Sequence, residues 1–194
     1  MIKLIYGVGV NDRRYPVYVA GKPIKEYDVW RQVLVRCYDP KYQKKRPSYV
    51  GCLVSENFKN FSFFYEWAQK QIGFGQEDFH LDKDVLVKGN KLYSEDTCIF
   101  LPSKLNALFT NCKSARGSLP VGVSLHGNGF QAECCLDKGK LSRYIGRFKT
   151  PDLAFQAYKQ AKETHIKLQA EKWKDQIDVR AYEALMRYEV LPTD

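Results

Sequence analysis

The chain has no apolar run that approaches the roughly 20 residues needed to cross a lipid bilayer. Its apolar N-terminal stretch is short, and Gly7, Gly9 and Asp12 interrupt it, unlike the continuous apolar segment of a secretory signal peptide. From these two absences we expect no membrane partner and a cytoplasmic location.

The chain also lacks the Cys-x-x-Cys pairs on which zinc knuckles depend. Four of its six cysteines are far apart in sequence: Cys37, Cys52, Cys98 and Cys112. The other two, Cys134 and Cys135, are adjacent, so on a strand they would point to opposite faces. We therefore expect no zinc and interpret the cysteines as buried thiols, kept reduced in the cytosol.

Acidic residues are fewer than basic ones. Asp and Glu total 22 against 31 Lys and Arg, which gives a formal net charge of +9 and a pI near 9.2. This balance favours polyanionic partners, nucleic acid first. Charge alone leaves open a basic soluble protein with no such partner, and the aromatic content of 14% suits base stacking and core formation equally.

The most informative stretch covers residues 79–106. Asp82 and Asp84 follow a short apolar approach, and their carboxylates would lie on one side of an extended strand. Gly89-Asn90 is typical of a turn, and residues 94–101 predict a helix start or tight turn before a buried run. We expect a strand pair that feeds a short helix, with acidic and amide groups gathered at the turn.

Four segments of this stretch carry a family resemblance: Leu81-Asp82-Lys83-Asp84, Gly89-Asn90-Lys91-Leu92-Tyr93, Cys98-Ile99-Phe100 and Asn106. Together they resemble the nuclease core of phage HNH-type homing endonucleases, and the likeness extends upstream to cover about residues 28–110. The resemblance implies a degenerate HNH module with a ββα-metal-like fold. It also implies cleavage of double-stranded DNA with a divalent metal, Mg²⁺ or Mn²⁺.

In this resemblance the metal ligands would be oxygen donors: Asp82, Asp84 and Asn106. An HNH nuclease also needs a general base, usually His, to activate water. Lys83 stands at that position here and Thr97 at the position of the last Asn. A Lys is protonated at neutral pH and is a poor base, so His80 or Lys83 would be a non-standard catalytic group.

Upstream, apolar residues at three- and four-residue spacing predict helices over residues 26–38 and 58–68. Asp39-Pro40 is expected to end the first helix. We interpret residues 41–46 as a basic loop with a tyrosine, which either contacts phosphate or is only solvated. The residues expected to hold a DNA backbone are Arg36, Lys44, Lys45 and Arg46.

We place a basic linker at residues 111–117, between a module of residues 1–110 and one of residues 118–194. The second module predicts three strands, at residues 120–124, 130–134 and 142–148, with a hairpin turn after the first. Thr150 and Pro151 then predict the start of a helix, and a further helix is expected near the C-terminus. The fold class is thus α+β, with a three-stranded antiparallel sheet packed on a helix.

Short segments here carry a second resemblance: Gly122-Val123, Phe130-x-Ala132, Tyr144-Ile145-Gly146-x-Phe148-x-Thr150 and Ala154–Ala161. They resemble the ethylene-response-factor type (AP2-like) DNA-binding domain, a companion of HNH homing endonucleases, whose sheet face enters the major groove. The residues expected to contact nucleic acid are Arg116, Ser124, His126, Asn128, Gln131, Glu133, Ser142, Arg143 and Tyr144. The inward set is Val123, Phe130, Ala132, Cys134 and Ile145.

Two functions from different classes follow. The first is a phage DNA-binding protein of HNH homing-endonuclease type that makes metal-dependent cuts. The second is a catalytically inactive, nuclease-derived binding protein that regulates or inhibits a host defence system through DNA or a host protein target. A third, an RNA-binding module, rests only on charge and aromatic content.

Overall fold

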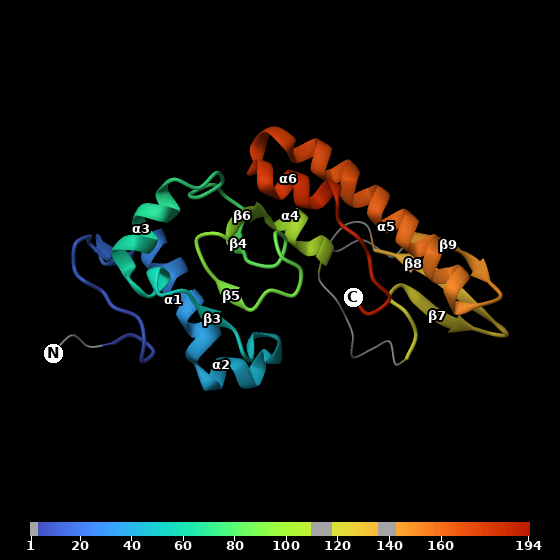
Figure 1. Cartoon of the computed structure of the whole chain (residues 1–194), viewed down its shortest axis with the longest axis horizontal. Helices are drawn as coiled ribbons and strands as arrows, with labels where there is room; N and C mark the ends of the chain where they lie inside the picture. The colour runs from blue at the N-terminus through green and yellow to red at the C-terminus, as the bar shows by residue number, and fades with distance from the viewer. Residues whose placement is uncertain (1–3, 110–117, 136–142) are drawn as a thin grey trace. The chain divides into compact units, whose positions relative to one another are not determined.

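The computed structural model describes residues 4–109, 118–135 and 143–194. The chain divides into two compact units, one ending at Leu101 and the other beginning at Pro102. Each unit combines helices with short strands (Figure 1), which confirms the α+β class. The linker predicted at residues 111–117 lies outside the described residues.

The first unit begins with a small hairpin and continues with helices separated by short strands. Its elements are β1 (Tyr18–Val19), β2 (Lys22–Pro23), α1 (Lys25–Tyr38), α2 (Pro40–Lys45), η1 (Pro47–Tyr49), β3 (Leu53–Val54), η2 (Asn57–Lys59) and α3 (Phe61–Gln69). Its second half holds β4 (Phe79–Asp82), β5 (Leu92–Tyr93) and β6 (Ile99–Pro102). β3 pairs with β5 in parallel, and β4 lies beside β6.

Aromatic side chains form the core between α1 and α3. Trp30 is fully buried against Phe61, at 5.3 Å between ring centroids, and its Nε1 donates a hydrogen bond of 2.7 Å to the carbonyl oxygen of Phe58. Phe58 and Phe64 are fully buried as well. Each such side chain contributes roughly 1.5–3 kcal/mol through burial, so these rings anchor the unit. The helix predicted at residues 26–38 is confirmed as α1. The one predicted at residues 58–68 begins only at Phe61, because Asn60 is its extended N-cap and Phe58 belongs to η2.

The basic segment at residues 41–46 is not a loop, as the sequence had suggested, because most of it forms α2. Asp39 caps this helix: its Oδ1 accepts hydrogen bonds from the backbone N–H of Lys41 at 2.8 Å and Tyr42 at 3.4 Å. Pro40 occupies the first helical position, where its missing N–H costs nothing. The Asp-Pro pair that ends α1 therefore also starts α2.

The second unit joins two short helical turns to a sheet and two helices. Its elements are α4 (Ser103–Asn106), η3 (Ala107–Phe109), β7 (Val123–His126), β8 (Gly129–Cys134), β9 (Arg143–Phe148), α5 (Pro151–Trp173), η5 (Lys174–Gln176) and α6 (Val179–Met186). The three strands form an antiparallel sheet, as predicted, in the order β7-β8-β9. The first strand includes His126 and begins at Val123, not at residue 120 as predicted, because residues 121–122 form a turn in which Gly122 has a φ of +73°. Thr150 caps α5 through a hydrogen bond from the Leu153 N–H to its hydroxyl, and Pro151 follows at the first helical position, also as predicted.

The core of this unit lies between the sheet and α5 (Figure 1). Its buried residues are Val123, Ala132, Cys134, Ala154, Phe155, Tyr158 and Val190. Phe130 and Ile145 pack against them, so the predicted inward set is confirmed. At Gly122 the backbone packs directly against the Tyr158 ring of α5. Its φ is +73°, and a Cβ there would lie 2.0 Å from that ring.

Within the described residues, no helix combines the length and the apolar composition needed to cross a lipid bilayer.

Candidate nucleic-acid interface

The outward face of the β7-β8-β9 sheet gathers polar side chains in cross-strand rows. Strand register places Ser124 opposite Gln131 and Gln131 opposite Arg147. Glu133 lies opposite Tyr144 in a second row. Because Val123, Ala132 and Cys134 point into the core, alternation along β7 and β8 turns Ser124, Gln131 and Glu133 to the other side. The side of the sheet away from α5 is thus rich in hydrogen-bonding groups.

A β-bulge sets which residues of β9 share this face. Ala132 pairs with Gly146, whereas Glu133 pairs with Tyr144, so Ile145 is an extra residue in β9. Tyr144 and Arg147 therefore lie on the same face although they are three residues apart. Strict alternation would have separated them.

The register of β9 bears on the predicted contact set at two positions, and the bulge accounts for the first of them. Arg147 joins the face, although the prediction had omitted it. Arg143 is opposite Cys134, whose side chain is in the core, so the register assigns Arg143 to the core side at the exposed end of β9. Gly146 was the sequence signal that could have revealed the bulge, and with it the placement of Arg147, since an isolated Gly inside a strand often marks a bulge.

The other predicted contact residues of this unit differ in their placement. His126 and Asn128 are exposed at the turn between β7 and β8, and Tyr144 keeps 58% of its surface exposed. Gln131 Nε2 donates a hydrogen bond to Glu133 Oε1, which holds the two side chains together on the outward face. Arg116 and Ser142 lie outside the described residues.

In the first unit, the region of the predicted catalytic site differs from its expected geometry. β4 ends at Asp82, so Asp82 and Asp84 do not lie on one side of an extended strand. Instead Asp82 Oδ1 accepts hydrogen bonds from the backbone N–H groups of Asp84 at 2.8 Å and Val85 at 2.7 Å, which closes a turn. Burial of the Asp82 carboxyl raises its pKa above the ordinary value.

Lys83 is buried at the centre of this turn. Its Nζ donates hydrogen bonds to Asp84 Oδ1 at 2.6 Å and to the carbonyl oxygen of Asn90 at 2.5 Å. The ammonium also lies 5.7 Å from the centre of the Tyr93 ring. Asn90 returns a hydrogen bond from Nδ2 to the Lys83 carbonyl at 2.9 Å. These contacts fasten the turn and leave the Lys83 Nζ buried and occupied by Asp84 and by the Asn90 carbonyl.

The remaining predicted catalytic and metal-binding residues are His80 and Asn106. His80 is exposed on β4, and Asn106 ends α4 in the other compact unit. One oxygen of Asp82 is taken by backbone amides and one of Asp84 by Lys83. Among the residues that the structure describes, no three His, Cys, Asp or Glu side chains are grouped so that they could hold a metal ion.

The buried thiols near this turn have no ionised form at neutral pH. Burial raises the pKa of Cys37 and of Cys98 to about 12. Both pack as small apolar residues, and Cys52 and Cys134 are buried as well, as predicted. Cys135 is exposed, contrary to the prediction, because it follows Cys134 and points away from the core, and Cys112 lies outside the described residues.

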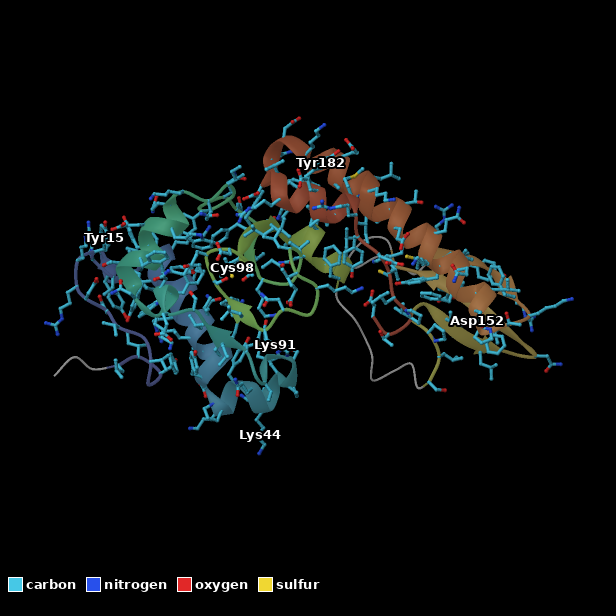
Figure 2. The ribbon with its side chains drawn as sticks, viewed as in Figure 1. Tyr15, Lys44, Lys91, Cys98, Asp152 and Tyr182 are labelled. Atoms are coloured by element: carbon cyan, nitrogen blue, oxygen red, sulfur yellow. The ribbon has the colours of Figure 1, made fainter. Side chains whose placement is uncertain are left out.

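The cations expected to hold a DNA backbone fall into two kinds. Lys44, Lys45 and Arg46 are exposed at the end of α2, and Lys44 projects into solvent in Figure 2. Arg36 is half-buried on α1, where its guanidinium lies 5.6 Å from the Tyr49 ring centre and 3.5 Å from the Tyr93 hydroxyl. The first three can reach a polyanion directly, whereas Arg36 already has aromatic partners.

Comparison of the chain with protein-family models, with curated proteins and with solved structures found no match in any of the three.

Proposed function

We propose that this protein binds double-stranded DNA, with the outward face of the β7-β8-β9 sheet in the major groove. The observation that carries the proposal is the bulge in β9, which aligns Tyr144 and Arg147 with Ser124 and Gln131 on one exposed face. Amide, hydroxyl and guanidinium groups are those that read base edges. The major groove of B-form DNA admits a two-stranded β-ribbon, and several DNA-binding proteins read bases with strands of a sheet.

The exposed cations of α2 supply the second kind of contact that a DNA-binding protein needs. Lys44, Lys45 and Arg46 are consecutive and exposed, and the chain carries a formal net charge of +9. Contacts to phosphate give affinity without sequence information, whereas contacts to base edges give specificity. We assign the first role to α2 and the second to the sheet.

The turn around Lys83 supports binding without cleavage. Lys83 is held by Asp84 and by the Asn90 carbonyl, and Asp82 is engaged in closing the turn. We therefore propose that residues 79–98 act as a scaffold, which corresponds to the non-catalytic one of the two functions considered from the sequence. Regulation of a host process through the bound DNA would follow from such a role.

The first experiment is a gel-shift titration with duplex DNA, run beside a supercoiled-plasmid assay with Mg²⁺ or Mn²⁺. We expect a shift without nicking. Tyr144→Ala should weaken binding roughly threefold to tenfold, because it removes a hydroxyl that can hydrogen-bond to a base edge and a hydrogen bond contributes a net of about 0.5–1.5 kcal/mol. Tyr144 is 58% exposed, so its removal should leave folding intact.

Leu168→Ala is the matched control, since Leu168 is 62% exposed but lies on α5. If the Tyr144 variant and the control bind DNA with equal affinity, the outward face of the sheet is not the DNA-contacting surface. Metal-dependent nicking that disappears in Asp82→Asn would establish the nuclease function instead. A protein that neither shifts nor cuts DNA would direct the search to a protein partner.

A further inference from the structure

The side chain of Arg147 lies across the start of β8 and ends at the β7-β8 turn. Its Nη2 donates a hydrogen bond of 2.7 Å to the carbonyl oxygen of His126. A Cβ on Gly129 would lie 3.2 Å from Arg147 Nε and 3.7 Å from its Cγ, and a Cβ on Gly127 would lie 2.8 Å from Nη2. The two glycines therefore leave the space through which this side chain passes.

This arrangement holds the guanidinium before any ligand arrives. A free Arg side chain loses rotamer entropy on binding, and a side chain already fixed in place loses less. The guanidinium is planar and carries five N–H donors, of which the His126 carbonyl accepts one. Arg147 remains exposed, in the same cross-strand row as Ser124 and Gln131, so its other donors can meet a ligand on the outward face.

We propose that Arg147 is a specificity-determining residue that reads a guanine in the major groove of the bound duplex. This inference rests on the proposed function. Guanine presents two acceptors, O6 and N7, at the spacing of the guanidinium fork, and this bidentate pair is the most common specific contact between arginine and DNA. Anchoring at the β7-β8 turn brings the guanidinium from the edge strand β9 over β8, among the base-reading side chains.

The test is selection of bound duplexes from a randomised pool, with the wild-type protein and with Arg147→Lys and Arg147→Gln. We expect the wild-type protein to require guanine at one position. Both variants should lose at least about tenfold of the preference for guanine there, because neither lysine nor glutamine reproduces the guanidinium fork. Arg147→Lys keeps the charge and the long aliphatic stem, so it carries the test if the glutamine variant does not fold.

Lys167→Gln is the control, because it removes the same charge from the same unit at an exposed position of α5, which packs on the other side of the sheet. It should keep the guanine preference. Two results would overturn the inference alone: an unchanged preference in both Arg147 variants, or a uniform loss across all sequences with a salt slope reduced by about one, as for a phosphate contact. If the wild-type protein retains no duplex, the proposed function fails and this inference with it.

Discussion

At the scale of single residues, the charges of the 82–84 turn are satisfied by their neighbours. Asp82 receives two backbone N–H groups, and Lys83 bridges Asp84 and the Asn90 carbonyl. A buried polar group without partners costs about 1–3 kcal/mol, so these short-range bonds are what allow charged side chains at this depth. The same burial makes the ionised form of the Asp82 carboxyl unfavourable.

We predict that Asp82→Asn stabilises the protein at pH 7.5 and has little effect at pH 3. Asn keeps the Oδ1 acceptor for Asp84 and Val85 and removes the charge. Because burial raises the pKa of Asp82 in the folded state, protonation at low pH favours folding, and this contribution is lost as the pH rises through the folded-state pKa. Urea unfolding of both proteins at several pH values measures the difference.

Asp175→Asn serves as the control for that series, since Asp175 is exposed in η5. Its unfolding midpoint should follow the wild-type protein at each pH. If Asp82→Asn is less stable than the wild-type protein at pH 7.5, the carboxylate has a favourable role as a charge, and the scaffold interpretation of this turn is wrong.

At the scale of elements, Asp39 joins two helices. Its N–H donates to the Val35 carbonyl at the end of α1, and its carboxylate caps the N-terminus of α2. A six-residue helix has few internal hydrogen bonds, so its cap contributes a large share of its stability. The position of the exposed cations of α2 therefore depends on one side chain.

We predict that Asp39→Ala costs about 1 kcal/mol in the free energy of unfolding, whereas Asp39→Asn costs a few tenths at most, since Asn is an equally good cap. Urea denaturation followed by circular dichroism measures both. Equal losses in the two variants would mean that the charge, and not the cap hydrogen bond, supports α2.

The helices whose apolar residues recur every three or four positions could be predicted from the sequence, because that spacing places these residues on one buried face. The spacing of Tyr27, Trp30 and Cys37 predicted α1, and all three are buried. The Thr150-Pro151 pair predicted the start of α5. In each case local preference and tertiary packing favour the same structure.

The candidate site was harder to predict, because it depends on where the regular alternation of side chains along a strand is interrupted. Simple alternation assigns Tyr144 and Arg147 to opposite faces, and only pairing with β8 shows that Ile145 is an extra residue. Similarly, Asp82 and Asp84 alternate in sequence as on a strand, but a backbone turn that Asp82 itself closes ends the strand there. A hydrogen bond from nearby backbone N–H groups to an Asp side chain competes with the hydrogen bonds between strands, and the amino-acid composition does not show whether a turn or a strand forms.

At the scale of the whole molecule, the exposed cations of α2 belong to one compact unit and the sheet face to the other. If the protein binds DNA as proposed, each phosphate that it neutralises releases counterions, and the slope of log K against log salt reports the number of phosphate contacts made by both units together. Affinity at a single salt concentration does not separate the two units, whereas the slope against salt does.

We predict that Lys44→Glu with Lys45→Glu reduces the slope of log K against log salt by about two, and lowers affinity for all duplexes alike. Fluorescence anisotropy over a salt series provides the measurement. Lys167→Glu with Lys172→Glu changes the net charge equally on exposed positions of α5 and should affect the slope much less. Equal slopes for the two double variants would show that net charge, and not α2, sets the salt dependence.

Gly89 and Gly122 share a φ of +73°, yet the space around them differs. Nothing lies within 4 Å of a Cβ placed on Gly89, so Asn or Asp, which tolerate a left-handed backbone, can replace it at small cost. At Gly122 the Tyr158 ring occupies that volume, and every other amino acid carries a Cβ. Position 89 can therefore accept a substitution by itself. A substitution at position 122 requires a compensating change at Tyr158 on α5, whose ring fills the space.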